Sequence, residues 1–354
     1  TQRGSFALEL PEEQSMQAEQ IGQLEAGAVS VAEEALLADE AGGRRQLFLV
    51  GYTVAQYRLD NYPLSNLQYH NGKKAEADVV ATFLPGEVVE SLYAAMRAAG
   101  LQVASMTLEP IAAMNAAIPA ELRLLNLALV DIGAGTTDIA LCRDGSVVGY
   151  TMATVAGDEV TEAIMKAFLV DFKTAEQLKR DMGGEEILRC RNILGQEERI
   201  DQQELISAIQ EPMERLARAI AKQVAEVNGG PPSALFLAGG GSKLSGLREK
   251  VAAALEMDER RVAIAGNNFA MSVYADSIEL ERPEYATPLG IAISAGMGLL
   301  NDSYVVLLNG EPAKLFRSGV LTLQDILLMN GYNYSVQQLL QFLPTEQLHL
   351  HSSG

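Results

Sequence analysis

The sequence predicts an α/β fold built as more than one domain, and three observations support this. The chain has 354 residues, whereas one domain takes roughly 100–200, so two or three domains are expected. Apolar residues make up 48% of the chain, which is enough to fill real cores. Strand-like and helix-like segments alternate along it, as they do in α/β proteins.

Composition excludes several classes of partner and site. The formal net charge of -19 repels nucleic acid and anionic lipid, so no nucleic-acid partner is expected. The two cysteines have neither metal-site nor disulfide spacing, which favours a reducing cytoplasm. No signal peptide and no apolar run of about 18 residues occur, so no membrane-spanning helix is expected. The chain starts at Thr1 rather than Met, and we expect it to be a piece of a longer protein.

The first third of the chain predicts strands and helices in alternation. Gly42 and Gly43 end an amphipathic helix, and Pro85 and Gly100 bound a second one. The expected elements are a helix over 21–43, strands with turns over 46–66, a strand over 77–85, a helix over 85–100 and a strand over 101–110. The last three form a strand–helix–strand unit.

The remainder predicts a meander, a helical region and two further glycine-marked units. Asp144–Gly145 is a tight-turn dipeptide between the second and third strands of the meander. The expected elements are strands over 127–132, 138–143 and 146–155, helices over 157–170, 173–183 and 202–227, a strand–loop–helix over 234–255 and a buried helix over 286–300. The tail predicts a hairpin over 303–316 and a helix over 321–333.

The segment "VDIGAGTTDIAL" places a glycine turn between two strands, directly after Asp131. A dinucleotide fold is excluded, because there the glycines lead into a helix. A structural hairpin and a phosphate cradle remain equally good interpretations of this segment alone. In a cradle, Gly133 and Gly135 let backbone amides close around phosphate oxygens, Thr136 and Thr137 add hydroxyl donors, and Asp131 holds a Mg²⁺-bound water.

A second glycine run, "LFLAGGGSKLSGL", follows another apolar strand. The backbone of Gly239, Gly240 and Gly241 lacks side chains, so it can lie flat against a nucleobase or ribose. The helix after it offers its N-terminus to an anion. A single run of this kind is usually a tight strand-to-helix turn. Two such runs about a hundred residues apart favour a nucleotide site.

These two loops, in this order, resemble those of the actin-like ATPase (ribonuclease H-like) fold, which includes actin, DnaK-type chaperones, sugar kinases, MreB, FtsA and PilM. The first loop is similar to the family's second phosphate motif and the second loop to its adenosine motif. "LEPIAAMNAA" is similar to the first connecting motif, in which Glu109 would lie near the nucleophilic water. The resemblance implies ATP and Mg²⁺ as ligands, with Glu109 and Asp131 as catalytic residues and Mg²⁺ held by Asp131 through water.

"VAGDEVTEAI" followed by "KTAEQLKRDMG" favours the FtsA/PilM-like branch, in which Glu176 and Lys179 would contact the ribose or base. The alternative is a solvated pair three residues apart on one helix face. Asp158 and Glu159 open a helix and are explained by its dipole, so Gly157 is the favoured backbone contact. The nucleotide contacts implied are Gly133, Ala134, Gly135, Thr136, Thr137, Gly157, Glu176, Lys179, Gly239, Gly240, Gly241 and Ser242.

The resemblance also implies a domain plan. Two lobes are expected, with residues 1–75 as an inserted FtsA-type small subdomain and 76–125 as the remainder of the first lobe. Residues 126–300 form the second lobe with a helical insertion at about 157–230, and 301–354 form a small C-terminal module. The family's first Asp-x-Gly-Thr phosphate motif has no copy here besides that at Asp131. We therefore expect that half of the phosphate grip precedes Thr1.

The function implied is an ATP-binding bacterial scaffold of FtsA type, which works in cell division or a cytoskeleton through nucleotide-dependent assembly and is at most a slow ATPase. A chaperone-like or reactivating ATPase is the alternative. A sugar or small-acid kinase is less favoured, because its base needs a polar pocket and all three histidines lie outside the motifs. Self-association or protein partners of a division or pilus assembly are expected.

The expected location is the cytoplasm, with recruitment to the inner membrane face through partners or missing segments. The only terminal candidate for an anchor is "SVQQLLQFLPTEQLHL", which lacks the basic face of a membrane-binding helix. Core packing or a truncated module is expected there instead, and no direct membrane segment.

Overall fold

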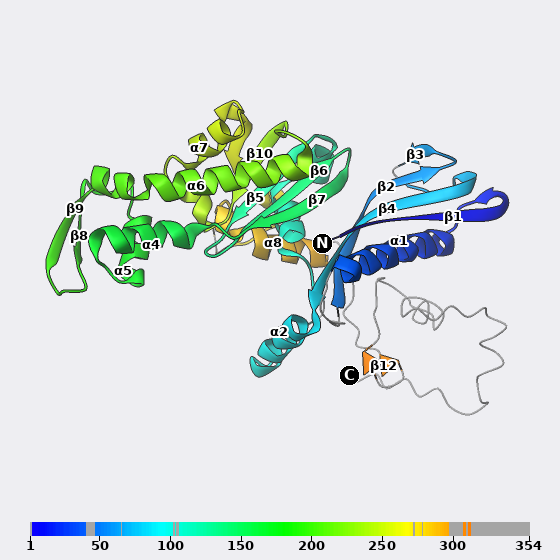
Figure 1. Ribbon diagram of the computed structural model, residues 1–354, viewed down its shortest axis with the longest axis horizontal. Coiled ribbons are helices and arrows are strands. Elements are labelled where there is room, and N and C mark those ends of the chain that lie inside the picture. The colour runs from blue at the N-terminus through cyan, green and yellow to red at the C-terminus, as the bar shows by residue number, and fades with distance from the viewer. Residues whose placement is uncertain are drawn as a thin grey trace.

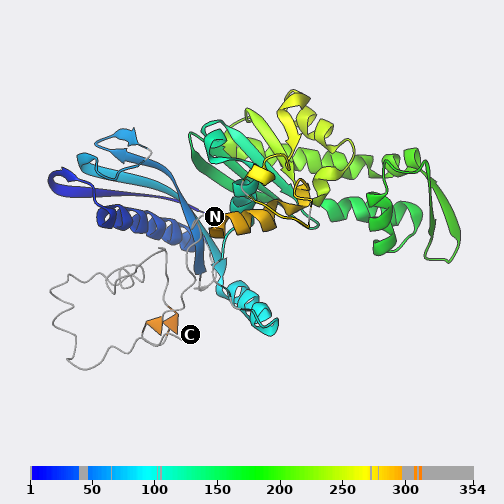
Figure 2. The same ribbon diagram turned by 180° about the vertical axis from the view of Figure 1, so that it is seen from behind.

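The computed structural model describes residues 2–39, 47–64, 66–101, 103, 106–271, 273–277, 279–296, 307–308 and 311–312. Two separate β-sheets lie one after the other along its longest axis, and a helical arm extends beyond the larger sheet (Figure 1). The same order is seen from behind, where the arm lies at the end opposite to the first sheet (Figure 2).

The first sheet is antiparallel and has the order β1-β4-β2-β3. Its elements are β1 (Gln2–Ser15), α1 (Ala18–Asp39), β2 (Leu47–Leu59), β3 (Tyr62–Leu64) and β4 (Asn71–Pro85). Alternate residues of β4, including Val79, Ala81 and Phe83, face Ala28 and Ala32 of α1 and form a core. The helix and the three later strands confirm the sequence prediction, whereas the acidic strand β1 was not predicted.

The second sheet is mixed and has the order β11-β10-β5-β6-β7. Its strands are β5 (Leu127–Ile132), β6 (Thr137–Arg143), β7 (Ser146–Ala153), β10 (Ala234–Ala238) and β11 (Val262–Ile264). The predicted antiparallel meander β5-β6-β7 is confirmed, and β10 runs parallel to β5. Asp144 and Gly145 both have positive φ, as the two central residues of a type I′ hairpin turn require.

Helices cover both faces of the second sheet. Val130 and Ile132 of β5 pack in the core that holds α6 (Gln202–Asn228) and α7 (Leu247–Ala254), whereas Leu127 and Leu129 pack in the core that holds α3 (Glu109–Ala117) and α8 (Ala286–Gly296). Every residue of β5 is therefore buried, which explains its continuous apolar run.

The helical arm comprises residues 157–201. It contains α4 (Gly157–Phe168), α5 (Phe172–Arg180), β8 (Ile187–Arg191) and β9 (Glu197–Asp201). At its end α6 begins with a capping box, because the Asp201 carboxylate accepts the amide of Gln203 and the Glu204 side chain accepts that of Asp201. All three predicted helices of this region are confirmed.

The strand predicted over 101–110 is wrong. None of the described residues 101, 103 and 106–108 is in a strand, and α3 begins at Glu109. α2 (Gly86–Ala98) leaves the end of β4 and carries the chain away from the first sheet (Figure 1). Pro110 in the first turn favours a helix start there.

The remaining elements are short. They are η1 (Ala120–Leu124), η2 (Gly240–Lys243), η3 (Glu259–Arg261), η4 (Phe269–Met271), η5 (Pro283–Tyr285), β12 (Leu307–Leu308) and β13 (Glu311–Pro312). β12 and β13 pair antiparallel, which confirms the predicted hairpin. The helix predicted over 321–333 and the segment 335–350 lie outside the described residues. Among the helices that the structure describes, none has the length and apolar character to cross a membrane.

Candidate functional site

The two glycine loops meet at one edge of the second sheet. β5 and β10 are parallel neighbours, and their register pairs Asp131 with Ala238, the last residue of β10. Gly133 and Gly239 then follow at the carboxyl ends of the two strands. Ligands of open α/β sheets bind at this edge, outside the carboxyl ends of the strands.

A cleft of about 570 Å³ lies between these loops and the arm. This volume falls in the range of small-molecule sites, about 300–1,000 Å³. The residues that line it come from the first loop, α4, α5 and the second loop, and they are Gly133, Ala134, Gly157, Asp158, Phe172, Glu176, Lys179, Arg180, Met182, Gly240, Gly241, Lys243, Leu244 and Ser245. The fold thus brings together seven residues of the predicted set that lie up to 108 positions apart.

The first loop is fixed by the start of α4. The Gly157 amide donates to the Gly133 carbonyl at 3.1 Å, and the Asp158 amide donates to the Ala134 carbonyl at 2.8 Å. Because the C=O and N–H of a trans peptide point in opposite directions, the amides of Ala134 and Gly135 point away from α4. The loop therefore presents amides rather than carbonyls on its far side, as an anion cradle requires.

The hydroxyls of the two predicted threonines donate hydrogen bonds within the protein. The Thr137 hydroxyl is fully buried and donates to the Val155 carbonyl at 2.8 Å. The Thr136 hydroxyl donates to Asp138 Oδ2 at 3.2 Å. Neither threonine lines the cleft in this arrangement, so their hydroxyls hold the loop between β6 and the segment that leads to α4.

The three glycines of the second loop differ in whether the structure leaves room for a side chain. Gly239 has a φ of +76°, and a Cβ on it would lie 2.3 Å from Asp131 Oδ1. A Cβ on Gly241 would lie 2.3 Å from Cγ2 of Ile132, whereas one on Gly240 would meet nothing within 4 Å. Ser242 is buried, and its hydroxyl donates to the Gly239 carbonyl at 2.7 Å, so it braces the loop.

Lys179 and Glu176 are largely buried rather than solvated, with side chains 14% and 22% exposed. The Lys179 ammonium pairs with Glu176 and donates to the Thr161 hydroxyl at 2.7 Å and the Gly157 carbonyl at 3.1 Å. Burial would raise the pKa of Glu176, but the hydrogen bonds from Lys179 and Thr161 outweigh it and lower that pKa. The pair therefore joins α5 to the start of α4 beneath the cleft.

Three carboxyl groups gather at the end of β5. Burial raises the pKa of Asp131 to about 6, although a hydrogen bond from Thr287 opposes the shift. Burial also raises the pKa of Glu109 and of Asp138, and the negative charge of Asp138 adds to the effect on Glu109. Within the described part of the chain, no three His, Cys, Asp or Glu side chains are close enough to hold a metal ion directly.

Several residues at this site were missed by the sequence analysis. Thr287 contacts both Asp131 and Glu109, and Phe172, Arg180 and Lys243 line the cleft. Lys243 is the second residue after the second glycine run, and this was a usable signal. Thr287 carries no local motif and reaches the site only through the packing of α8.

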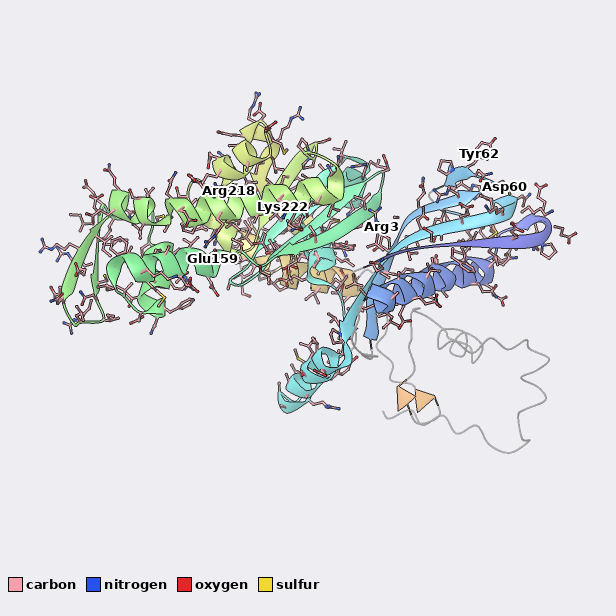
Figure 3. The ribbon with its side chains drawn as sticks, viewed as in Figure 1. Arg3, Asp60, Tyr62, Glu159, Arg218 and Lys222 are labelled. Carbon is pink, nitrogen blue, oxygen red and sulfur yellow. The ribbon has the colours of Figure 1, made fainter. Side chains whose placement is uncertain are left out.

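Glu159 has a packing role. It accepts a hydrogen bond from Arg215, so it joins α4 to α6. Figure 3 shows Glu159 on α4 below the side of α6 that carries Arg218 and Lys222. Glu159 is not among the residues that line the cleft.

Comparison with known proteins supports the assignment drawn from the motifs. Residues 128–290 match the family described as cell division protein FtsA. The chain is 23% identical over 227 residues to cell division protein FtsA of Bacillus subtilis, covering 60% of this chain and 49% of that protein. It is 31% identical over 134 residues to FtsA of Pseudomonas aeruginosa, covering 36% of this chain and 31% of that protein.

A solved structure described as the PilM-PilN type IV pilus biogenesis complex superposes with a TM-score of 0.56 and 22% identity, covering 82% of this chain and 76% of that chain. This likeness confirms the predicted fold class. The chain spans about half the length, or less, of the curated relatives that it matches.

Proposed function

We propose that this chain, whose residues 128–290 match the FtsA family, is an actin-like protein of the FtsA/PilM-like branch and binds ATP in the cleft between its two glycine loops. One observation carries the proposal: both loops and the Glu176–Lys179 pair line the same cleft, although they come from three distant parts of the chain. If each glycine loop were only a strand-to-helix turn, it would have no reason to share a cleft with the other loop and with the Glu176–Lys179 pair.

The residues present fit the parts of a nucleotide. The amides of Ala134 and Gly135 would hold phosphate oxygens on the side of the first loop that faces away from α4. Lys179 and Lys243 line the cleft, where each is paired with a carboxylate, Glu176 and Glu284 respectively. Gly240 leaves open space in which a flat base or ribose would lie. Glu176 offers a carboxylate to ribose hydroxyls.

Mg²⁺ would be held through water rather than by direct ligands, because the acidic side chains nearby form no direct metal site among the described residues. Asp131 is the group we assign to that water shell, and Glu109 the group that orients the attacking water. The bound metal would neutralise phosphate charge. Any hydrolysis is proposed to be slow.

We further propose that ATP sets the conformation that neighbouring copies or protein partners recognise, so that the chain acts as a cytoskeletal scaffold in division or pilus assembly. The FtsA relatives favour this over a chaperone-like ATPase or a kinase. The work would take place in the cytoplasm, at the inner membrane face where partners recruit it.

Calorimetry with Mg-ATP tests the proposal on this chain and on Gly240→Val. Because a side chain at Gly240 meets open space, the variant should fold normally but fill the cleft. We expect the dissociation constant for ATP to rise about tenfold or more, which corresponds to about 1.4 kcal/mol.

Gly51→Val is the matched control. Gly51 lies in β2, and a Cβ there also meets nothing within 4 Å, so ATP binding should remain as in the unmodified chain. No heat of binding in the unmodified chain, or equal affinity in all three proteins, would contradict a nucleotide site at this cleft.

A further inference from the structure

Thr287 joins three elements at one hydroxyl group. It lies in the first turn of α8, and its Oγ1 is 2.9 Å from Asp131 Oδ2, at the end of β5. The same oxygen lies 3.5 Å from Glu109 Oε1, at the start of α3. A hydroxyl has one hydrogen to donate, so the shorter contact to Asp131 takes it.

The Asp131 carboxylate is hydrogen-bonded on one side and closely packed on the other. Its Oδ2 accepts from Thr287, and its Oδ1 lies where a Cβ on Gly239 would come within 2.3 Å. The residue is only 7% exposed, so few water molecules can replace the Thr287 hydroxyl as a donor. A buried carboxylate that loses its donor turns toward whatever solvent or donor remains.

The helix that carries Thr287 is itself closely fixed. A Cβ on Gly290 would lie 1.7 Å from the Ala112 carbonyl oxygen, so α8 and α3 pack backbone to backbone. Asn115 donates to the Ser294 hydroxyl at 2.8 Å across the same interface. A side chain on such an element places its hydroxyl more accurately than one on a loop.

We infer that Thr287 is a positioning residue that fixes the orientation of the Asp131 carboxylate and thereby the Mg²⁺-dependent part of ATP binding. The Mg²⁺ part rests on the function proposed above. The fixing of the carboxylate does not, because it follows from contacts in the protein alone. These two parts call for separate measurements.

The first measurement is the ¹³C resonance of the Asp131 carboxyl carbon in protein labelled at aspartate, assigned with Asp131→Asn and recorded at pH 8 without nucleotide. We expect Thr287→Val, which keeps the shape but removes the hydroxyl, to move this resonance. Thr287→Ser keeps the hydroxyl and should leave it as in the unmodified chain. Thr151→Val is the control, since Thr151 of β7 is half-buried and donates to Gln223 of α6.

The second measurement is the gain in ATP affinity on adding Mg²⁺, from calorimetry with Mg²⁺ and with EDTA. Thr287→Val should reduce this gain about tenfold, the size expected for a hydrogen bond to a charged group. Thr287→Ser should restore it, and affinity in EDTA should stay unchanged.

An unmoved resonance in Thr287→Val, or equal displacement in the valine and serine variants, would overturn the positioning role. Equal Mg²⁺ gains in all variants would overturn its link to the metal. If the unmodified chain binds no ATP, the proposed function fails, and the resonance alone decides the role of Thr287.

Discussion

At the scale of single residues, the polar groups around the cleft already have partners within the protein. Lys179 contacts Gly157 and Thr161 as well as Glu176, and Asp131 contacts Thr287. Such groups cost free energy to bury and are then expensive to leave without a partner. Their substitution should therefore change stability as well as ligand binding, and each prediction needs both measurements.

Lys179→Met should lower the free energy of unfolding by about 1–3 kcal/mol, because it removes the charged donor from the largely buried Glu176 carboxylate and from the Gly157 carbonyl. The affinity for ATP should fall with it. Lys166→Met is the control, since Lys166 pairs with Glu162 on the exposed face of α4 and such a pair contributes about 0–1 kcal/mol. Urea denaturation compares the two, and equal losses would show that the burial of Lys179 has no energetic consequence.

Asp131→Asn should change how stability depends on pH. The folded pKa of about 6 lies above the ordinary 3.8, so the native state holds the proton more tightly and loses stability as pH rises from about 4 to about 6. At 1.36 kcal/mol for each tenfold change in proton affinity, the loss is about 3 kcal/mol. The asparagine variant should be the more stable protein at pH 7.5.

Urea denaturation of both proteins between pH 4 and pH 8 measures this difference. Glu109 and Asp138 titrate in both proteins, so subtracting the two curves leaves the contribution of Asp131 together with its interaction with these two carboxyl groups. A difference that stays constant across the range would mean that the pKa of Asp131 is not raised on folding.

At the scale of elements, the site depends on how closely helices approach the sheet and one another. α3 and α8 cover the face of the second sheet opposite to α6 and α7. Their contact has no room for a side chain at Gly290, where Ala112 lies directly opposite. The positions of Glu109 and Thr287 follow from this crossing, since each is at the start of one of the two helices.

Gly290→Ala should therefore force α3 and α8 apart and lower the free energy of unfolding by about 1–3 kcal/mol or more. Gly296→Ala, in the last position of α8, meets no atom within 4 Å and should be neutral or slightly stabilising, because alanine favours helix over glycine by about 1 kcal/mol. Thermal or urea unfolding distinguishes them. A stable Gly290→Ala variant would show that the crossing can relax.

At the scale of the whole molecule, two units with their own cores meet where β1 and β2 approach β7. The first sheet packs with α1 and the second with α3, α6, α7 and α8, and the two units have separate clusters of buried residues. Arg3 donates to the Val148 carbonyl at 2.5 Å, and the hydroxyls of Thr53 and Tyr150 lie 3.4 Å apart. Figure 3 shows Arg3 at this junction, far from Asp60 and Tyr62 at the outer end of the first sheet.

The net charge of -19 should oppose the proposed self-association. Salt shortens the range of repulsion, with a Debye length of about 10 Å at 0.1 M and about 3 Å at 1 M. We therefore expect Mg-ATP-dependent assembly to increase between 50 and 300 mM KCl in sedimentation velocity runs. Assembly that weakens with salt would instead indicate an interface held by opposite charges.

Most helices and strands were predicted correctly because turn residues, helix-bounding residues and apolar runs lie within the segment that they define. Asp144–Gly145 marks its turn, Pro85 and Gly100 bracket α2, and the apolar run 127–132 predicts a buried strand. The failures are of a different kind. β1 and the strand expected over 101–110 both depend on whether a partner edge lies alongside, and the sequence of the segment itself does not contain that information.

For the site, the sequence by itself determined which backbone positions must lack a side chain and which carboxylates follow the strands. Gly133, Gly239 and Asp131 could be named because glycine runs after apolar strands are rare and have few uses. Only the tertiary structure decided that Thr287 bonds to Asp131, that Lys179 is buried against Gly157, and that Gly240, unlike Gly239 and Gly241, faces open space. These facts depend on the parallel pairing of β5 with β10 and on the crossing of α3 with α8. Contacts between segments more than a hundred residues apart are set by packing, which no local pattern contains.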